Sequence, residues 1–364
     1  MTSPDTEPAL QQRVSEIEDL LRKRTRVKQE TRILDLLRPL NFSAFANVLS
    51  KLNLIRLVDA LDSRMWGPDS RKEFLRLLEP AIHHLDLNCK TDLIRGLAEG
   101  ITDLAAEKTI RDIFLSENGP KLTELKLAVD CANTGHDLLH ILYSDIDSAD
   151  VRYDIIKHFQ ASPTEKVAEE ELPLRVVSDI DDTIYASLND SRFKKGTVYP
   201  GVLGLLSSLS TLPPVFLTAR PELAASLFER VTHRQLSSYG IERCTVLSGS
   251  LPGLFGHRRM AEQKSRTLTS FKELYPELRF LFIGDSGQGD YALSKSLMER
   301  EKNPIEIALI HRLAEHQPGS VSDHPLIRTF DNYGEAASIL EENGFLTSDQ
   351  AQAIRDECAI DHTA

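Results

Sequence analysis

The sequence lacks an apolar run that approaches the ~20 residues of a membrane-spanning helix. Its first residues, MTSPDTEPALQQ, have neither the cationic region nor the apolar region of a secretory signal. The four cysteines, Cys89, Cys131, Cys244 and Cys358, are far apart and form no CxxC pair, which argues against a disulfide framework and against a zinc site. We therefore expect a soluble, cytoplasmic protein with reduced cysteines and no transmembrane segment.

Basic residues are also in the minority. The 364 residues include 43 Lys and Arg against 55 Asp and Glu, which gives a formal net charge of −12. This balance argues against indiscriminate binding to nucleic acid, so no nucleic-acid partner is expected. The length exceeds the roughly 250–300 residues at which a single hydrophobic core stops growing, and two domains are therefore expected.

The first 160 residues are poor in glycine and rich in leucine, and their apolar positions recur at intervals of three and four residues. This pattern predicts an all-helical domain over residues 1–160. Binding of a protein partner is one role that we consider for this domain. Residues 161–173, ASPTEKVAEEELP, combine prolines with glutamates and almost no apolar side chain, as in a linker. We take this acidic segment as the domain boundary.

Beyond the linker the periodicity changes. Short β-branched or aromatic runs, LRVVSDI, PVFLT, CTVLS, RFLFIGD and IEIALI, alternate with helical stretches. This alternation predicts a Rossmann-like α/β domain over residues 174–364, with a parallel sheet covered by helices on both faces and a helical C-terminal tail. Ligands in such sheets bind at the carboxyl ends of strands, which is where Asp179, Asp181, Thr218 and Asp285 fall.

The tetrapeptide Ser-Asp-Ile-Asp occurs twice. The first copy, around Asp145, lies between two amphipathic stretches, so Asp147 or Ser148 is well placed to cap the second helix. A calcium loop would need an oxygen ligand and a glycine where the chain has Ala149 and Asp150. The first copy is therefore predicted to be a helix–helix turn without catalytic chemistry.

The second copy ends a strand, where residues two apart point to the same side, so Asp179 and Asp181 face one site. Two adjacent carboxylates repel, and a divalent cation removes this conflict. A carboxylate, a neighbouring main-chain carbonyl and a third carboxylate, that of Asp285, are oxygen ligands suited to Mg²⁺, and we predict a magnesium site of Asp179, Asp181 and Asp285. One carboxylate can attack phosphorus, and the other can protonate the leaving oxygen and then activate water.

These motifs carry a resemblance to a known superfamily. DIDDT at 179–183, Thr218, Lys264 and GDSGQGD at 284–290 resemble, in order, the four motifs of the haloacid-dehalogenase-like phosphohydrolases. Through SDIDDTI, PGVLGLLSSL and FIGDSGQGD, residues 172–312 are more closely similar to the catalytic domain of the actin-patch phosphatidate phosphatase family. The resemblance implies a phosphatase that hydrolyses a phosphomonoester, such as phosphatidate, through an aspartyl phosphate.

The resemblance implies roles for residues of these motifs: Asp179 as nucleophile, Asp181 as general acid and base, Thr218 and Lys264 as phosphate ligands, Thr183 as a substrate-binding residue, Asp285 as a magnesium ligand and Asp290 as its support. For the lysine, only the distance along the chain to Asp285 favours Lys264 over Lys272.

One segment departs from the lipid phosphatases: they have a serine-rich segment with Ser-Pro-Trp after the second strand, and this chain has TARPEL. The resemblance therefore does not carry specificity for phosphatidate to this chain. Arg220 offers a fork of donors for a phosphate or carboxylate of the substrate, and a salt bridge to Glu222 is the alternative. The intervals 185–200 and 249–260, where the superfamily inserts cap domains, are short, so we expect a minimal cap. Such a site admits a bulky or surface-bound phosphate, for example a lipid head group or a phosphoprotein.

Three weaker signals remain. His136 and His140 have the spacing of a zinc pair, but Asp137 replaces the general-base glutamate, and ordinary core or surface histidines are favoured. The basic run RKRTRVK, residues 22–28, fits either peripheral contact with anionic lipid or, as the preferred interpretation, a salt-bridged helix face. Finally, a scaffold or adaptor with a vestigial phosphatase-like domain is the alternative to an enzyme, although the intact carboxylates favour the enzyme.

Overall fold

The structure is a computed structural model that describes residues 6–61, 69–100, 102–131, 137–161, 171–187, 189–218, 225–248, 257–287, 289–300, 303–313 and 324–360. By its internal contacts the chain divides into two compact units. The first is Met1–Asp130 with Leu138–Thr164, and the second is Cys131–Asp137 with Glu165–Ala364. The domain limits given by the sequence remain a prediction.

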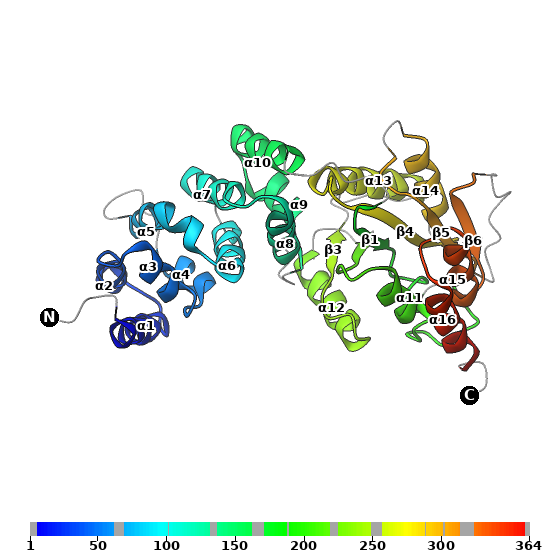
Figure 1. Ribbon diagram of the computed structural model, residues 1–364, viewed down its shortest axis with the longest axis horizontal. Helices are drawn as coiled ribbons and strands as arrows, with labels where there is room; N and C mark the ends of the chain where they lie inside the picture. The colour runs from blue at the N-terminus through cyan, green and yellow to red at the C-terminus, as the bar shows by residue number, and fades with distance from the viewer. Residues whose placement is uncertain are drawn as a thin grey trace. The chain divides into compact units, whose positions relative to one another are not determined.

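The first unit is built from helices (Figure 1). They are α1 (Glu7–Leu21), α2 (Val27–Leu37), α3 (Phe42–Leu49), α4 (Leu54–Ala60), α5 (Ser70–Leu78), α6 (Leu87–Ala98), α7 (Leu104–Leu115), α8 (Gly119–Asp130), α9 (Leu138–His140) and α10 (Ala149–Ala161). A 3-10 helix, Glu79–His84, follows α5, and a π-helical turn, Ile141–Asp145, follows α9. Apolar side chains at helical spacing, such as Ile33, Leu34 and Leu37 of α2, are buried in its core.

Short polar residues set where several of these helices begin. An Asn or Asp side chain before each helix accepts a hydrogen bond from the backbone N–H three residues later, as Asn41, Asn53, Asp69, Asp86 and Asp103 do for α3 to α7. Each cap stabilises its helix by about 1 kcal/mol relative to alanine. In the first unit, the residue just before a helix therefore helps to determine where that helix begins.

The second unit contains a six-stranded parallel sheet in the order β3-β2-β1-β4-β5-β6. The strands are β1 (Leu174–Ser178), β2 (Val215–Thr218), β3 (Thr245–Ser248), β4 (Arg279–Asp285), β5 (Ala308–His311) and β6 (Ile327–Phe330). The central strands β1 and β4 are almost wholly buried, as expected for a sheet covered on both faces. The predicted α/β architecture is confirmed, and β6 is an edge strand that the sequence did not predict.

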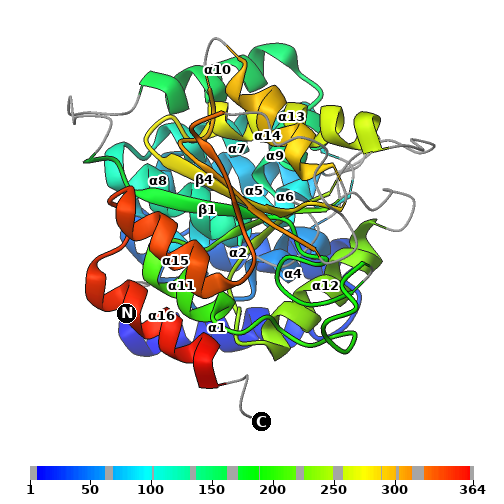
Figure 2. The same cartoon turned by 90° about the vertical axis from the view of Figure 1, so that its right-hand side faces the viewer.

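Helices cover both faces of this sheet. They are α11 (Val202–Leu209), α12 (Ala225–Ser238), α13 (His257–Leu274), α14 (Asp290–Met298), α15 (Tyr333–Glu342) and α16 (Ser348–Ile360). Figure 2 shows α13 and α14 on one face and α11, α15 and α16 on the other. Residues 185–187 and 189–200 form a loop with isolated bridges from Tyr185 to Asp181 and Val198. Of the second interval considered for a cap, residues 249–256 lie outside the described residues, so the minimal cap remains a prediction.

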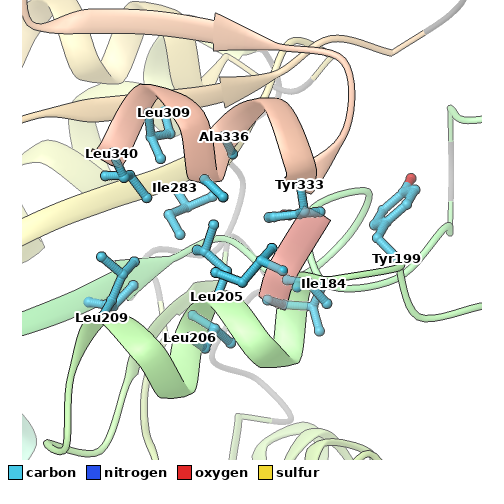
Figure 3. Packing of buried hydrophobic residues seen from close by; sticks show 14 of the residues in the cluster. Ile184, Tyr199, Leu205, Leu206, Leu209, Ile283, Leu309, Tyr333, Ala336 and Leu340 are labelled. Carbon is cyan, nitrogen blue, oxygen red and sulfur yellow. The ribbon is translucent and has the colours of Figure 1, made fainter. Parts of the chain in front are cut away.

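The core on the α11 side is continuous from the sheet to the outer helices. Leu205 and Leu209 of α11 are buried in the same cluster as Ile283 of β4 and Leu340 of α15 (Figure 3). Each fully buried leucine or isoleucine stabilises the fold by roughly 1.5–3 kcal/mol. This packing makes the sheet a rigid base for the loops at its carboxyl edge.

Two further observations concern the whole described chain. Within the described ranges, no helix combines the length and the apolar character needed to cross a bilayer. None of the four cysteines, all of which are described, forms a disulfide, and all four are buried.

Candidate active site

Two aspartates meet at the carboxyl edge of the central strands. Asp179 directly follows β1, and its N–H donates to the carbonyl of Ile283 in β4 at 2.8 Å. Asp285 is the last residue of β4. Because β1 and β4 are parallel neighbours, with Ser178 opposite Ile283, both carboxylates lie at the same end of the sheet.

A third aspartate and a lysine complete the cluster. One carboxylate oxygen from each of Asp179, Asp285 and Asp290 lies within 4.8 Å of the other two, and all three residues are buried. From α13, Lys264 Nζ donates to Asp179 Oδ1 at 2.9 Å and to Asp290 Oδ1 at 2.8 Å. Lys264 carries one positive charge and faces three carboxyl groups. When all three are ionised, two negative charges therefore remain uncompensated.

Burial and the short distances between these charged groups shift their pKa values. Burial raises the pKa of Asp179 to about 7; Asp290 adds to the rise, and Lys264 opposes it. Burial and the charges of Asp290 and Asp179 raise the pKa of Asp285 to about 9. Burial would lower the pKa of Lys264, but Asp179 and Asp290 outweigh it, so the net shift is upward and the lysine stays charged.

Glycines in GDSGQGD allow the chain to bring Asp285 and Asp290 together. A Cβ on Gly284 would lie 2.5 Å from Asp290 Oδ2, so only glycine leaves room for that carboxylate. Gly289 has φ = 91°, a left-handed conformation that glycine adopts without penalty, and it turns the chain into α14 so that Asp290 is the first helical residue. The N–H of Gly287 donates to Asp285 Oδ1 at 2.6 Å.

This donor set fits a hard divalent cation. All three groups offer carboxylate oxygens, which Mg²⁺ and Ca²⁺ prefer over the nitrogen and sulfur donors that zinc selects. A divalent ion would also balance the two negative charges that Lys264 leaves uncompensated. The buried aspartate cluster can therefore hold a metal ion at the edge of the sheet.

The carboxylate of Asp181 is not one of the three that lie within 4.8 Å of one another, although its charge contributes to raising the pKa of Asp179. Tyr185 Oη donates to Asp181 Oδ1 at 3.2 Å. Of the predicted metal set, the structure thus groups Asp179 and Asp285 with Asp290, which was predicted only as a support, and not with the carboxylate of Asp181.

The structure describes two other residues of the predicted site, Thr183 and Thr218. Thr183 Oγ1 is buried and has no hydrogen-bond partner among the described residues. Thr218 ends β2 at the carboxyl edge and is half-buried. Arg220 lies outside the described residues. Lys272, the alternative to Lys264, donates from Nζ to the carbonyl of Leu278.

The first Ser-Asp-Ile-Asp copy has a different environment. The N–H groups of Asp147 and Ser148 donate to the buried carboxylate of Glu107 at 2.9 and 3.2 Å. Ser148 Oγ accepts from the N–H of Val151 at 3.4 Å, at the start of α10. His140 Nε2 lies 3.4 Å from an oxygen of Asp145, whereas His136 lies outside the described residues. This copy is a helix–helix turn, as the sequence indicated.

The turn after Asp181 contains a feature that the motif analysis missed. Asp182 has φ = 57°, and among the described non-glycine residues it alone has a positive φ. Its main-chain carbonyl accepts a hydrogen bond from His311 Nδ1, and the carbonyl of Thr183 accepts one from Tyr333 Oη. Side-chain bonds to distant main-chain carbonyls leave no periodic sequence pattern, so no signal pointed to His311 or Tyr333.

A comparison with protein families finds a match to this part of the chain. Residues 174–312 match the family model of the catalytic domain of phosphatidate phosphatase APP1, which confirms the family resemblance stated above for that domain. The match supports a phosphatase. No curated protein and no solved structure matches the chain.

Proposed function

We propose that this chain, whose residues 174–312 match a phosphatidate phosphatase catalytic domain, is a magnesium-dependent phosphatase that cleaves the phosphomonoester of a phosphatidate-type lipid through an aspartyl phosphate. The observation that carries the proposal is the buried cluster of Asp179, Asp285 and Asp290, bridged by Lys264. Three carboxylates at the carboxyl edge of a parallel sheet lie where ligands of such sheets bind.

Asp179 and Asp285 would hold the metal ion, with Asp290 beside them. When bound, Mg²⁺ would offset the charge of the carboxylates and of the substrate phosphate, and so lower the cost of bringing anion to anion. The chain's own groups complete the site. Lys264 keeps Asp179 Oδ1 in place through a 2.9 Å hydrogen bond, which leaves the second carboxylate oxygen for attack.

In the first step, Asp179 forms a bond from a carboxylate oxygen to phosphorus while the bond from phosphorus to the alcohol oxygen breaks. Asp181 gives its proton to the leaving oxygen. In the second step, water attacks phosphorus, its proton passes to Asp181, and the bond to Asp179 breaks. Inorganic phosphate leaves, and both aspartates return to their starting states.

The proposed substrate is a lipid at a membrane surface, which favours peripheral contact of the protein with anionic membranes. Within the described residues no large cap lies over the site, and Thr183 Oγ1 is a buried hydroxyl without an intramolecular hydrogen-bond partner. Thr183, Thr218 and the third hydrogen of Lys264 Nζ are the proposed contacts to the phosphate.

Phosphate release by the full-length protein tests this proposal. Substrates are phosphatidate in detergent micelles, a sugar phosphate, a nucleotide and a phosphopeptide, each with Mg²⁺ and with a chelator. We expect turnover of phosphatidate that needs Mg²⁺ and is abolished in Asp179→Asn, because an amide cannot attack phosphorus.

Asp145→Asn is the matched control, since it makes the same change in the other Ser-Asp-Ile-Asp copy, and it should leave turnover intact. Preference for one of the other substrates would overturn the lipid assignment. Absence of release from every substrate, with the protein folded and Mg²⁺ present, would overturn the phosphatase proposal in favour of the adaptor alternative.

A further inference from the structure

The main-chain turn that follows Asp181 is held in an unusual conformation. Asp182, with φ = 57°, occupies the left-handed region that is disfavoured for residues with a Cβ. Such conformations persist only where the surroundings fix them, and they concentrate at functional sites. The contacts that fix Asp182 therefore bear on how the adjacent Asp181 is positioned.

Contacts within the loop account for part of this restraint. The N–H of Asp182 donates to the carbonyl of Tyr185 at 2.9 Å. The carboxylate of Asp182 accepts from the N–H groups of Ser187 at 2.7 Å and Asn189 at 2.8 Å. These bonds tie the turn to the loop that follows it, but they do not connect it to the rigid part of the domain.

Two side chains from the far part of the sheet provide that connection. His311, the last residue of β5, lies with Nδ1 3.1 Å from the carbonyl of Asp182, so Nδ1 carries the hydrogen. Its Nε2 then accepts from a guanidinium nitrogen of Arg192 at 3.0 Å. Tyr333 Oη donates to the carbonyl of Thr183 at 2.6 Å.

Tyr333 is itself firmly anchored. It is the first residue of α15, whose N-cap Asn332 accepts from the N–H of Glu335 at 3.0 Å. Its ring is 1% exposed and lies 5.1 Å, centroid to centroid, from that of Phe330. Figure 3 shows it within the same buried cluster as Ile184, the residue after Thr183. Burial also raises the pKa of Tyr333, so the hydroxyl remains a donor.

We propose that Tyr333 is a positioning residue for the phosphatase reaction: its hydroxyl, together with His311, holds the Asp182–Thr183 turn and thereby sets the position of Asp181. Asp181 is coupled to this turn through the bridge and the 3.2 Å hydrogen bond that it shares with Tyr185. The assignment rests on the proposed function for the role of Asp181. Tyr333 lies outside residues 174–312, so the family match says nothing about it.

The test is the substitution Tyr333→Phe in the full-length protein, which removes the hydroxyl and keeps the ring. We expect kcat to fall about 10- to 100-fold, since a displacement of about 1 Å at catalytic groups has costs of this order. KM should change much less than kcat, because Tyr333 touches no group of the metal cluster and Thr183 is only one of the three proposed phosphate contacts. Amide hydrogen exchange at Asp182 and Ile184 should become faster.

Tyr199→Phe is the matched control. Tyr199 is also a buried tyrosine, and its hydroxyl donates to Asp190 Oδ2 at 2.9 Å instead of to the catalytic turn. This variant should lose at least as much thermal stability as Tyr333→Phe. Its kcat and the exchange of the turn should change much less, because its hydroxyl reaches the turn only indirectly, through Asp190, Arg192 and His311. Equal losses of kcat in both variants would mean a merely structural role and overturn the inference.

A second pair of variants covers the case in which Tyr333→Phe does not fold. His311→Asn keeps an N–H that can reach the carbonyl of Asp182, and His311→Leu does not. We expect slow turnover and fast exchange of the turn only in His311→Leu, and equal behaviour of the two would contradict the inference. If the wild type releases phosphate from no substrate, the proposed function fails. If amide hydrogen exchange at Asp182 and Ile184 is unchanged in Tyr333→Phe, the inference that Tyr333 holds the turn fails, whatever the activity.

Discussion

Lys264 connects two of the three clustered carboxylates, and its side chain is only 6% exposed. Removing one partner of a buried ion pair leaves an uncompensated charge and typically costs about 3–5 kcal/mol. We therefore expect Lys264→Met to lower the free energy of unfolding by an amount of this order in the metal-free protein, measured by urea denaturation.

Lys272→Met is the control on the same helix, because Lys272 donates to the carbonyl of Leu278 and lies over the ring of Phe280, away from the two aspartates that Lys264 binds. Lys272→Met should lower the free energy of unfolding much less than Lys264→Met does. A loss equal to that of Lys264→Met would show that the charge cluster does not determine the result.

The two aspartates of the second Ser-Asp-Ile-Asp copy should be separable by their intermediates. Asp181→Asn removes the proton donor and acceptor, so we expect phosphorylation and dephosphorylation both to slow by about 10²–10⁴-fold. Asp179→Asn should form no phosphoprotein at all. Acid quenching with a radiolabelled substrate measures both, and a labelled protein in Asp179→Asn would contradict the assignment of the nucleophile.

The start of α14 determines whether Asp290 can reach the cluster. In Gly284→Ala the new Cβ would lie 2.5 Å from Asp290 Oδ2, so Asp290 must move away from Lys264. We expect metal affinity to fall about 10- to 100-fold, as for other supporting groups of metal sites, with the fold retained because Gly284 has no positive φ. Titration calorimetry with Mg²⁺ measures this.

Gly204→Ala is a matched control in α11, since its Cβ would approach only the end of the Glu357 side chain, which can move. Metal affinity should then equal that of the wild type. Unchanged affinity in Gly284→Ala as well would exclude a contribution of Asp290.

The basic segment 22–28, which runs from the end of α1 into the first two residues of α2, has fewer ion pairs than its acidic neighbours suggested. Arg22 pairs with Asp19 at 3.3 Å, but Glu30 is buried and accepts from Ser70. Lys23, Arg24, Arg26 and Lys28 are exposed and form no ion pair with another described residue.

Because each basic residue near an anionic membrane contributes about 1 kcal/mol, we expect weak, salt-sensitive binding of the protein to phosphatidylserine vesicles. Reversing the charges of Lys23, Arg24, Arg26 and Lys28 should abolish it. Co-sedimentation measures this, with phosphatidylcholine vesicles as the control. Binding that survives both charge reversal and high salt would contradict a role for this segment.

The elements differ in how well their sequence predicted them. LRVVSDI and RFLFIGD predicted β1 and β4, because central strands of a parallel sheet are continuous apolar runs. The strand β6 was missed because it lies at the edge of the sheet, where Arg328 and Thr329 are only half-buried and interrupt the pattern.

The same difference holds for the site. The position of Asp179 and Asp285 at one edge follows from strand order alone, whereas that of Lys264 came from the family resemblance. Asp290 was predicted only as a support, since nothing local shows that Gly284 leaves space for it. Tyr333 could not be predicted, because its hydrogen bond to Thr183 joins residues that only the folded sheet brings together.

At the scale of the whole molecule, the carboxylate cluster should make stability depend on pH. The pKa values of Asp179 and Asp285 are raised to about 7 and about 9 in the folded protein, above an unfolded value of about 3.9. The folded state therefore binds more protons than the unfolded state between these values, and stability falls as pH rises.

For the metal-free protein we expect the melting temperature of the second unit to decrease from pH 5 towards pH 9, measured by calorimetry in a chelator. Mg²⁺ should raise the melting temperature, and more so at high pH, because it replaces the protons on the carboxylates. In Asp179→Asn the melting temperature should decrease less between pH 4 and pH 7 than in the wild type. A melting temperature that rises with pH in the chelator would contradict these proton affinities.

The strand order has a consequence for how the protein folds. β1 pairs with β4, so Leu174 lies opposite Arg279, and the chain between them includes β2, β3 and three helices. Contacts between residues so distant in sequence form slowly, because closing a long loop has an entropic cost. Asp179 and Asp285 meet only after this pairing, so their carboxylates do not repel each other while the chain collapses. A metal ion would therefore slow unfolding instead of guiding the search for the fold, since its binding site does not exist before the sheet has formed.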